Sequence, residues 1–360
     1  MGKRELGLIL AFVVAGAIIW QVTAPKAEGP GFSMSTWLSN VRREMRGRNA
    51  SAELTTAPAI PVDASISEIR LTLRGEITII GEDREDVGSE LNVVSNGTDE
   101  AEAKQLASET RLKVSKFADS VVIALAFPEP GRQEAKLTLR VPARLRIQLD
   151  GRGTAKVSGV SAVTLARSNG EIELTDITGL VKGEHRSGTL VVQGAQAVDL
   201  YSVSSETTIS GVREDLSLNS RGGEARISKS PGKVTITAGD SRVRVDGPTG
   251  MLRAEIVDGE LDLRDVSSEI DIDARETPVT VAWARVATTK IQVREGSLEI
   301  TPPSDASAYS LDARLSGGEL RVPDSLQKTT EGDESAVTKT GGPNAAPIFV
   351  RGTGSTITIR

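Results

Sequence analysis

Short runs of alternating aliphatic and polar residues repeat along the middle of this chain. Each run carries two inward positions separated by one residue, and glycine, serine, asparagine or aspartate stands at the boundaries. The successive pairs are Ala155/Val157, Val163/Leu165, Ile172/Leu174, Leu190/Val192, Val198/Leu200, Thr207/Ile209, Leu216/Leu218, Ala225/Ile227, Val234/Ile236, Val243/Val245, Leu252/Ala254, Leu261/Leu263, Ile270/Ile272 and Val279/Val281. From Thr207 onward the spacing is nine residues, and before that it is eight or nine. This regularity predicts a solenoid.

Alternation over five residues predicts a strand with one buried face. The boundary residues favour tight turns, and no helical stretch separates the runs, which excludes a chain of strand–helix–strand units. A spacing of nine leaves only about four residues for each turn, so successive strands must lie on different sides of one coil. We therefore predict an all-β fold, a parallel β-helix in which each coil covers the apolar face of its neighbour.

The outward charges bear on the number of strands in one coil, because stacked strands place equivalent residues about 4.8 Å apart. An 18-residue step stacks Arg242 over Glu260 and Arg244 over Asp262, which is favourable. The same step also places Arg226 over Arg244. A 27-residue step, with three sides per coil, likewise gives one favourable and one unfavourable pair. We prefer an 18-residue coil, made of two nine-residue halves, and keep the 27-residue coil as the alternative.

The two ends of the β-rich region differ from its middle. We expect residues 62–150 to form a β-rich N-terminal cap, 151–300 the β-helix repeats and 301–360 the C-terminal coils. Within the cap, Asp99 and the alanines and glutamates after it predict a short helix near residues 99–109. The polar segment 327–347 is expected to be a mobile loop. A solenoid needs a cap because an open end exposes unpaired backbone and core.

The N-terminus predicts a membrane segment. Residues 6–22 carry no charge and are preceded by Lys3 and Arg4, so they are expected to form a transmembrane anchor after a cytoplasmic stub of residues 1–5. Cleavage as a signal peptide near Val22-Thr23-Ala24 is the alternative. Long C-terminal domains translocate largely regardless of nearby charges. We therefore expect the bulk of the chain outside the cytoplasm, in the periplasm, on a single-pass anchor.

Residues 23–61 are expected to form a basic juxtamembrane helix and a linker. Trp37 lies on the apolar side of the helical pattern, and Arg42, Arg43 and Arg46 crowd its end. These four residues predict a helix lying on an anionic membrane surface. A plain spacer helix with a basic end is the alternative. The segment 49–61 is expected to be a flexible tether.

Composition excludes several classes of site. The chain contains no cysteine and one histidine, so disulfides, thiolate metal sites and cysteine nucleophiles are all excluded. The net charge of −6 argues against nucleic acid, which usually requires a concentrated basic face. Aromatic residues make up only 3% of the chain, which gives few platforms for stacking on sugar rings.

Candidate chemistry is sparse. His185 in KGEHRSG is expected to be a solvated turn residue. A Ser-His-Asp triad would have to use it and no GxSxG motif accompanies it, so we expect no catalytic triad and no enzyme activity. We expect no cofactor. Calcium is the metal to consider, because nine-residue β-rolls bind it, but those rolls need GGxGxD turns that this chain lacks. The weak calcium candidates are Asp262, Asp265, Asp271 and Asp273, and a solvated acidic face is the preferred interpretation.

The segment EIELTDITG, the regular GxhxhxD units (h, hydrophobic), PPSDASAYSLDARLSGGELRVP and the closing GTGSTITIR together resemble the bacterial "putative adhesin" domain-of-unknown-function family. The resemblance covers about residues 62–360, and the order of these motifs is more specific than any one of them. That family is akin to auto-transporter adhesin heads and to membrane-anchored accessory proteins of envelope-stress operons. The resemblance implies a right-handed β-helix at the cell envelope, and it offers no catalytic residues to transfer.

We therefore predict a non-enzymatic, membrane-anchored protein with a structural, adhesive or scaffolding role at the cell envelope. The expected partners are the lipid bilayer, through residues 6–22, and an envelope protein or polysaccharide, with no nucleic acid. The oligomeric state is left open by the sequence. One alternative is an accessory or sensor module in envelope-stress signalling. A second is a polysaccharide-active β-helix enzyme, and an intracellular polymer is a third if the orientation is reversed.

Overall fold

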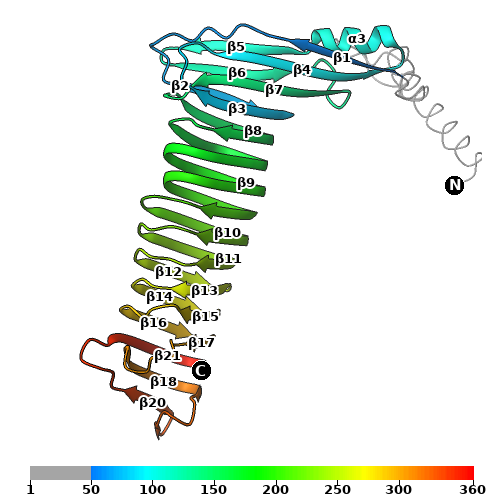
Figure 1. The fold of residues 1–360 in the computed structure, drawn as a ribbon. Helices are drawn as coiled ribbons and strands as arrows, with labels where there is room; N and C mark the ends of the chain where they lie inside the picture. The colour runs from blue at the N-terminus through cyan, green and yellow to red at the C-terminus, as the bar shows by residue number, and fades with distance from the viewer. Residues whose placement is uncertain (1–49) are drawn as a thin grey trace, which may run out of the picture.

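The computed structural model describes residues 50–360, which form a long solenoid with a cap lying across its N-terminal end (Figure 1). The predicted anchor 6–22, the juxtamembrane helix and the residues Trp37, Arg42, Arg43 and Arg46 lie outside the described residues. Among residues 50–360, no helix has both the length and the apolar character needed to cross a bilayer.

The solenoid is built from strands that stack in parallel. Its strands are β8 (Arg146–Ser158), β9 (Ala162–Ser210), β10 (Leu216–Ser228), β11 (Val234–Asp246), β12 (Leu252–Val257), β13 (Glu260–Val266), β14 (Ile270–Arg275), β15 (Pro278–Trp283), β16 (Thr289–Arg294) and β17 (Ser297–Thr301). Strand β9 runs without a break through several coils. The all-β, solenoid-like fold predicted from the alternation is confirmed.

Most coils follow the 18-residue step. Leu216 pairs with Val234, and Val234 in turn pairs with Leu252, each in parallel register. The step shortens to 16 and then 17 residues where β8 meets β9, with a register shift between Leu149 and Asp150, and it lengthens to 19 where β14 meets β16. These pairings exclude the 27-residue coil. The right-handed sense of the coil stays a prediction.

Charges on the outer faces follow the same step. Arg242 contacts Glu260 at 2.7 Å and Arg244 contacts Asp262 at 3.1 Å, one coil apart in each case. Arg226, which lies in register with Arg244, turns instead to the carboxylate of Glu206 at 2.7 Å. Neighbouring carboxylates thus separate the two like charges. Exposed pairs of this kind contribute only about 0–1 kcal/mol each, so they set register more than stability.

Two columns of left-handed residues form the edges of the solenoid. One column, at successive coils, is Ser204, Gly222, Asp240, Asp258, Glu276 and Glu295, and the other is Asp176, Gly194, Gly211, Lys229, Gly247 and Asp265. All have φ between +46° and +73°. This conformation costs about 1–2 kcal/mol for a residue with a side chain, whereas glycine adopts it freely. The edges therefore hold small amounts of backbone strain at known positions.

Replacing Glu276 by glycine is expected to stabilise the protein by about 0.5–1 kcal/mol, because relief of the left-handed strain exceeds the entropy that glycine adds to the unfolded chain. Glu276 has φ +52° and only an exposed contact with Arg275 at 3.3 Å. Glu276→Ala is the matched control, since it removes the charge but keeps Cβ. Urea denaturation measures both. A gain for alanine equal to that for glycine contradicts the strain argument.

One apolar core runs the full length of the described chain. A single cluster of buried residues extends from Ile60 in the cap to Ile359 in the last strand. Its members are almost all valine, isoleucine, leucine and alanine, which fill the narrow space between two strand layers. Trp283 also lies in this core, with 7% of its surface exposed. Continuity of the core means that the coils cannot bend independently of one another.

The cap is a mixed sheet that continues the stack upward. Its elements are β2 (Glu68–Leu73), β3 (Glu76–Glu82), β4 (Gly88–Gly97), α3 (Glu100–Glu109), β5 (Arg111–Phe117), β6 (Ser120–Ala126) and β7 (Gln133–Pro142). Strands β2 and β3 both pair in parallel with β8. Above them β6 and β7 pair in parallel with β2 and β3, and antiparallel β5 and β4 close the sheet. Asp99 caps α3 by accepting a hydrogen bond from the Glu102 backbone N–H at 2.8 Å.

The flexible tether predicted for residues 49–61 is wrong for its first half. Residues Ala50–Thr56 form strand β1, which pairs antiparallel with β4. The small polar composition suggested a linker, but β4 offers an unpaired edge and Leu54 packs against the core beside it. Pairing β1 to this edge satisfies backbone groups that would otherwise be exposed.

Two structural features cover the C-terminal end of the solenoid. Strands β18 (Tyr309–Arg321), β19 (Lys328–Glu331), β20 (Glu334–Lys339) and β21 (Ala346–Ile359) make up this end. Strand β21 lies between the β16/β17 coil and β18, and it pairs in parallel with both. The hairpin β19–β20 then covers β18 with antiparallel pairing. The mobile loop predicted for 327–347 is therefore wrong over both strands: polar residues there alternate with Val337, which is buried.

Candidate functional site

The four calcium candidates do not converge. Asp262 lies on β13 between the guanidinium groups of Arg244 and Arg264, at 3.1 and 2.9 Å. Asp271 and Asp273 lie on β14, which stacks on a different side of the coil, and Asp265 is a left-handed edge residue. Within residues 50–360, no three metal-binding side chains gather closely enough to hold an ion. Asp262 and Asp273 are better described as members of the outer ion pairs, because Asp273 contacts Arg294 at 3.1 Å.

His185 is not a solvated turn residue, and that prediction is wrong. Its side chain is fully buried inside β9, where Nδ1 lies 3.1 Å from the Ser168 hydroxyl and Nε2 has no partner within the described chain. The pattern Val181, Gly183, His185 continues the inward alternation and carries the imidazole into the core. Burial lowers the pKa of His185 to about 4, because the charged form loses its hydration.

Buried hydroxyl groups follow His185 along one edge of the solenoid interior. In the next coil Ser202 lies 2.6 Å from Ser205 and 2.8 Å from Thr207, and one coil further Ser220 lies 3.0 Å from Ser241. The side chains satisfy one another, as buried polar groups require. This column is closed to solvent, so it explains local packing and offers no open site.

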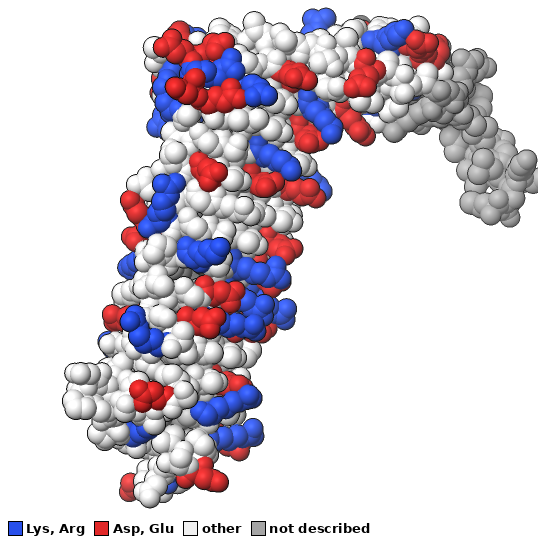
Figure 2. Space-filling model, in the orientation of Figure 1, with Lys and Arg blue, Asp and Glu red and all other residues white. Residues whose placement is uncertain are grey.

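An open hollow of about 650 Å³ lies at the bend between cap and solenoid. It is formed by the β2–β3 turn, the loop between β6 and β7, the start of β7 and the bend of β8 (Figure 1). Its walls comprise Arg74, Gly75, Glu76, Phe127, Pro130, Gly131, Gln133, Glu134, Ala135, Lys136, Arg152, Gly153 and Thr154. We call this the elbow hollow. Charged side chains of both signs border the inner side of the bend in Figure 2.

Gln133 is the unusual member of the elbow hollow. It is 7% exposed, and both Oε1 and Nε2 are buried without a hydrogen-bond partner within residues 50–360. Leaving such a buried amide unpaired costs about 1–3 kcal/mol. At the rim, Arg74 and Arg152 are exposed and form no ion pair with the described residues, whereas Lys136 contacts Glu76 at 3.0 Å. The hollow therefore combines unused hydrogen-bonding capacity with free positive charge.

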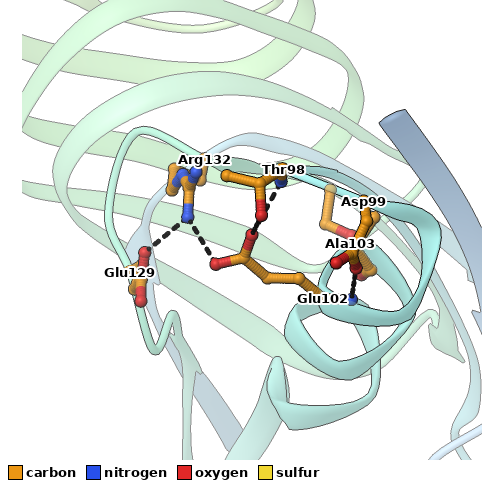
Figure 3. Close-up of polar contacts among 7 residues, drawn as sticks. Thr98, Asp99, Glu102, Ala103, Glu129 and Arg132 are labelled. Carbon is orange, nitrogen blue, oxygen red and sulfur yellow. Dashed lines mark hydrogen bonds and ion pairs between the residues drawn. The ribbon is translucent and has the colours of Figure 1, made fainter. Parts of the chain in front are cut away.

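The loop that walls the hollow is held in place from the other side (Figure 3). Arg132 contacts Glu102 of α3 and Glu129 of the loop, both at 3.1 Å, and only 17% of the Arg132 side chain is exposed. Thr98 donates its backbone N–H to Glu102 at 2.6 Å, which fixes that carboxylate at the start of the helix. This network places Phe127 and Pro130 against the hollow with little freedom.

The sequence contained a signal for Gln133 that composition alone does not show. In QEAKLTLRV the inward positions are Gln133, Ala135, Leu137, Leu139 and Val141, so a glutamine stands where an aliphatic residue is expected. Arg74 and Arg152 carry no such signal, because only the stacking of β8 under β3 brings their turns together.

Comparisons with known proteins point to one family. The family model described as Toastrack DUF4097 matches residues 66–360. No curated protein matches the sequence. Solved structures include a "putative adhesin" from Parabacteroides distasonis, 11% identical, covering 87% of this chain and 98% of that one at a TM-score of 0.35. A "putative cell adhesion protein" from Clostridium sporogenes is 7% identical, and the match covers 86% of this chain and 99% of that one at a TM-score of 0.20. A "Putative lipid binding protein", also from P. distasonis, is 11% identical, and the match covers 86% of this chain and 96% of that one at a TM-score of 0.29.

Proposed function

Because the chain belongs to the Toastrack DUF4097 family, we propose that it is a membrane-anchored, extracytoplasmic rod with an adhesive or scaffolding role and no enzymatic activity. In this proposal residues 6–22 anchor the rod, and its outer faces bind an envelope protein or polysaccharide.

The observation that supports the proposal best is the uninterrupted core between two covered ends. Buried residues form one cluster from Ile60 to Ile359, the cap covers one end, and strand β20 covers residues 311–316 of β18 at the other. About ten stacked coils at about 4.8 Å each give a solenoid on the order of 50 Å long. Strand β20 pairs antiparallel with residues 311–316 of β18, which blocks parallel addition of a further coil along that half of the last coil.

The outer faces suit multivalent contact. Strand residues of successive coils stack in ladders, and basic and acidic side chains lie close together along the edge of the solenoid in Figure 2. Arg242 with Glu260 and Arg294 with Asp273, at 2.7 and 3.1 Å, each join neighbouring coils. Many weak, regularly spaced contacts produce avidity without a single deep site.

Protease access tests the location. A protease site inserted at the exposed Gly332–Asp333 turn is expected to be cut when protease is added to spheroplasts whose inner membrane is intact. An insertion at the same turn in cells expressing the chain without residues 1–22 is the cytoplasmic control and should stay protected until lysis. Protection of the full-length chain in spheroplasts overturns the extracytoplasmic proposal.

Binding to envelope material tests the role. Vesicles carrying the full chain are expected to capture isolated cell-envelope fragments, and the capture should weaken as salt rises, because the ladders act through exposed charges. Vesicles without protein are the control. Equal capture by both kinds of vesicle rejects the adhesive and scaffolding role.

A further inference from the structure

We propose that the elbow hollow binds the carboxylate end of a peptide, with Gln133 pairing to the backbone N–H and C=O of its penultimate residue and Arg74 and Arg152 facing its carboxylate. This goes beyond the rod function, because a pocket that recognises one chemical group differs from a face that makes many weak contacts. Its failure would leave the rod proposal intact.

The amide of Gln133 determines the first half of the ligand. A glutamine side chain offers one acceptor and two donors, and here all are buried without a partner among the described residues. One extended residue of a peptide presents its own N–H and C=O toward the same side, so it can donate to Oε1 and accept from Nε2 at once. A simple inorganic ion satisfies only the donor.

The guanidinium groups determine the second half. Arg74 and Arg152 come from two turns that β3–β8 pairing brings together, and neither is neutralised by an ion pair within residues 50–360. Glu76 is already engaged by Lys136, so Glu134 is the remaining carboxylate on the wall that forms no ion pair within residues 50–360. The uncompensated charge is one positive unit, which attracts a single carboxylate. Planar guanidinium groups match carboxylates in two-point contacts.

The remaining walls limit the size of the ligand's final side chain. Phe127 and Pro130 give an apolar side, and the ion pairs of Arg132 hold their loop in place. Gly75 and Gly153 also line the hollow, and both lie against the chain's own backbone: a Cβ would meet the Ala135 carbonyl oxygen at 2.4 Å and the Gly75 carbonyl oxygen at 2.9 Å. A ligand with a small apolar final residue fits this arrangement.

Titration of the full chain in lipid nanodiscs tests the proposal. The probe is N-acetyl-Ala-Ala with a free carboxylate, and its C-terminal carboxamide is the matched control. We expect saturable binding of the acid and at least roughly tenfold weaker binding of the carboxamide, which cannot make the charged contacts. Acids of L and D configuration distinguish a protein end from a cell-wall peptide as the source. Equal affinity for acid and carboxamide, or no binding of any acid at millimolar concentration, overturns the proposal.

Three variants separate binding from folding. Gln133→Met keeps the side-chain length but removes the unpaired amide, so we expect a higher unfolding midpoint together with roughly tenfold weaker binding. Arg74→Gln combined with Arg152→Gln should abolish measurable binding at an unchanged unfolding midpoint. Arg221→Gln on β10, an exposed arginine remote from the hollow, should change neither. Full retention of binding by Gln133→Met shows that the amide does not contact the ligand.

Discussion

Deleting residues 216–233, one whole coil, is expected to leave a folded rod that is shorter by one step. The deletion places Val198 of the preceding coil directly over Val234, and the edge residue Ser204 over Asp240, so every inward and left-handed position keeps an equivalent neighbour. Repeat stability is roughly a sum over coils and their interfaces. We therefore expect a loss of only about 1–3 kcal/mol, the average share of one coil.

Deleting half a coil, residues 216–224, is the matched control with the opposite outcome. Alternation is preserved, but each later strand moves to the other side of the coil, and the long turn around Lys229 falls where the tight edge at Gly222 belongs. We expect a loss of at least about 5 kcal/mol, with the C-terminal coils unfolded. Urea denaturation followed by circular dichroism measures both deletions. Similar stability for the two would contradict the two-sided, 18-residue coil.

Acidification is expected to destabilise the protein through His185 between pH 6.5 and about 4. Burial lowers the pKa of His185 from 6.5 to about 4 in the folded state, while the unfolded chain keeps the ordinary value. In this window the unfolded state binds a proton at His185 and the folded state does not, so the free energy of unfolding falls as the pH falls. At about 1.4 kcal/mol per pKa unit, the loss approaches about 3 kcal/mol by pH 4. Above pH 6.5 the effect disappears.

The variant His185→Asn isolates this contribution. Asparagine can keep a hydrogen bond to Ser168 and does not titrate, so the difference in unfolding free energy between native protein and variant should change across the window. Carboxylates contribute equally to both proteins and cancel. Because the chain has one histidine, a single imidazole resonance reports its titration directly. A folded-state midpoint at the ordinary histidine value would mean that His185 meets water, contrary to its burial.

The solenoid could be predicted because one physical rule acts at every coil. Inward positions two residues apart must be apolar and the turns must be short, so the nine-residue period can be recognised in the sequence. The 18-residue step could also be argued, since Arg242 with Glu260 and Arg244 with Asp262 are both formed. The stacking of Arg226 over Arg244 seemed to argue against this step. Sequence alone does not show that the Arg226 side chain turns to Glu206 instead.

Features that form where segments far apart in the sequence pack together could not be predicted. Strand β1 is polar enough to resemble a linker, and its structure depends on the edge that β4 provides. The elbow hollow depends on turns that lie far apart along the chain. His185 and Gln133 are different, because both stand at inward positions of an alternating run. A polar residue at such a position is buried, and following the alternation through it would have placed both correctly.

The insertion of β21 between two earlier-made coils has a consequence for biosynthesis. A solenoid that stacks in chain order can grow as it leaves the ribosome, but here β18 finds its parallel neighbour only in a strand that is translated after it. The lower end therefore closes only once β21 has emerged. A truncated chain that ends before β21 leaves the strand edges of the β16/β17 coil and of β18 unpaired and the hairpin poorly held. Such chains are expected to be degraded by proteases.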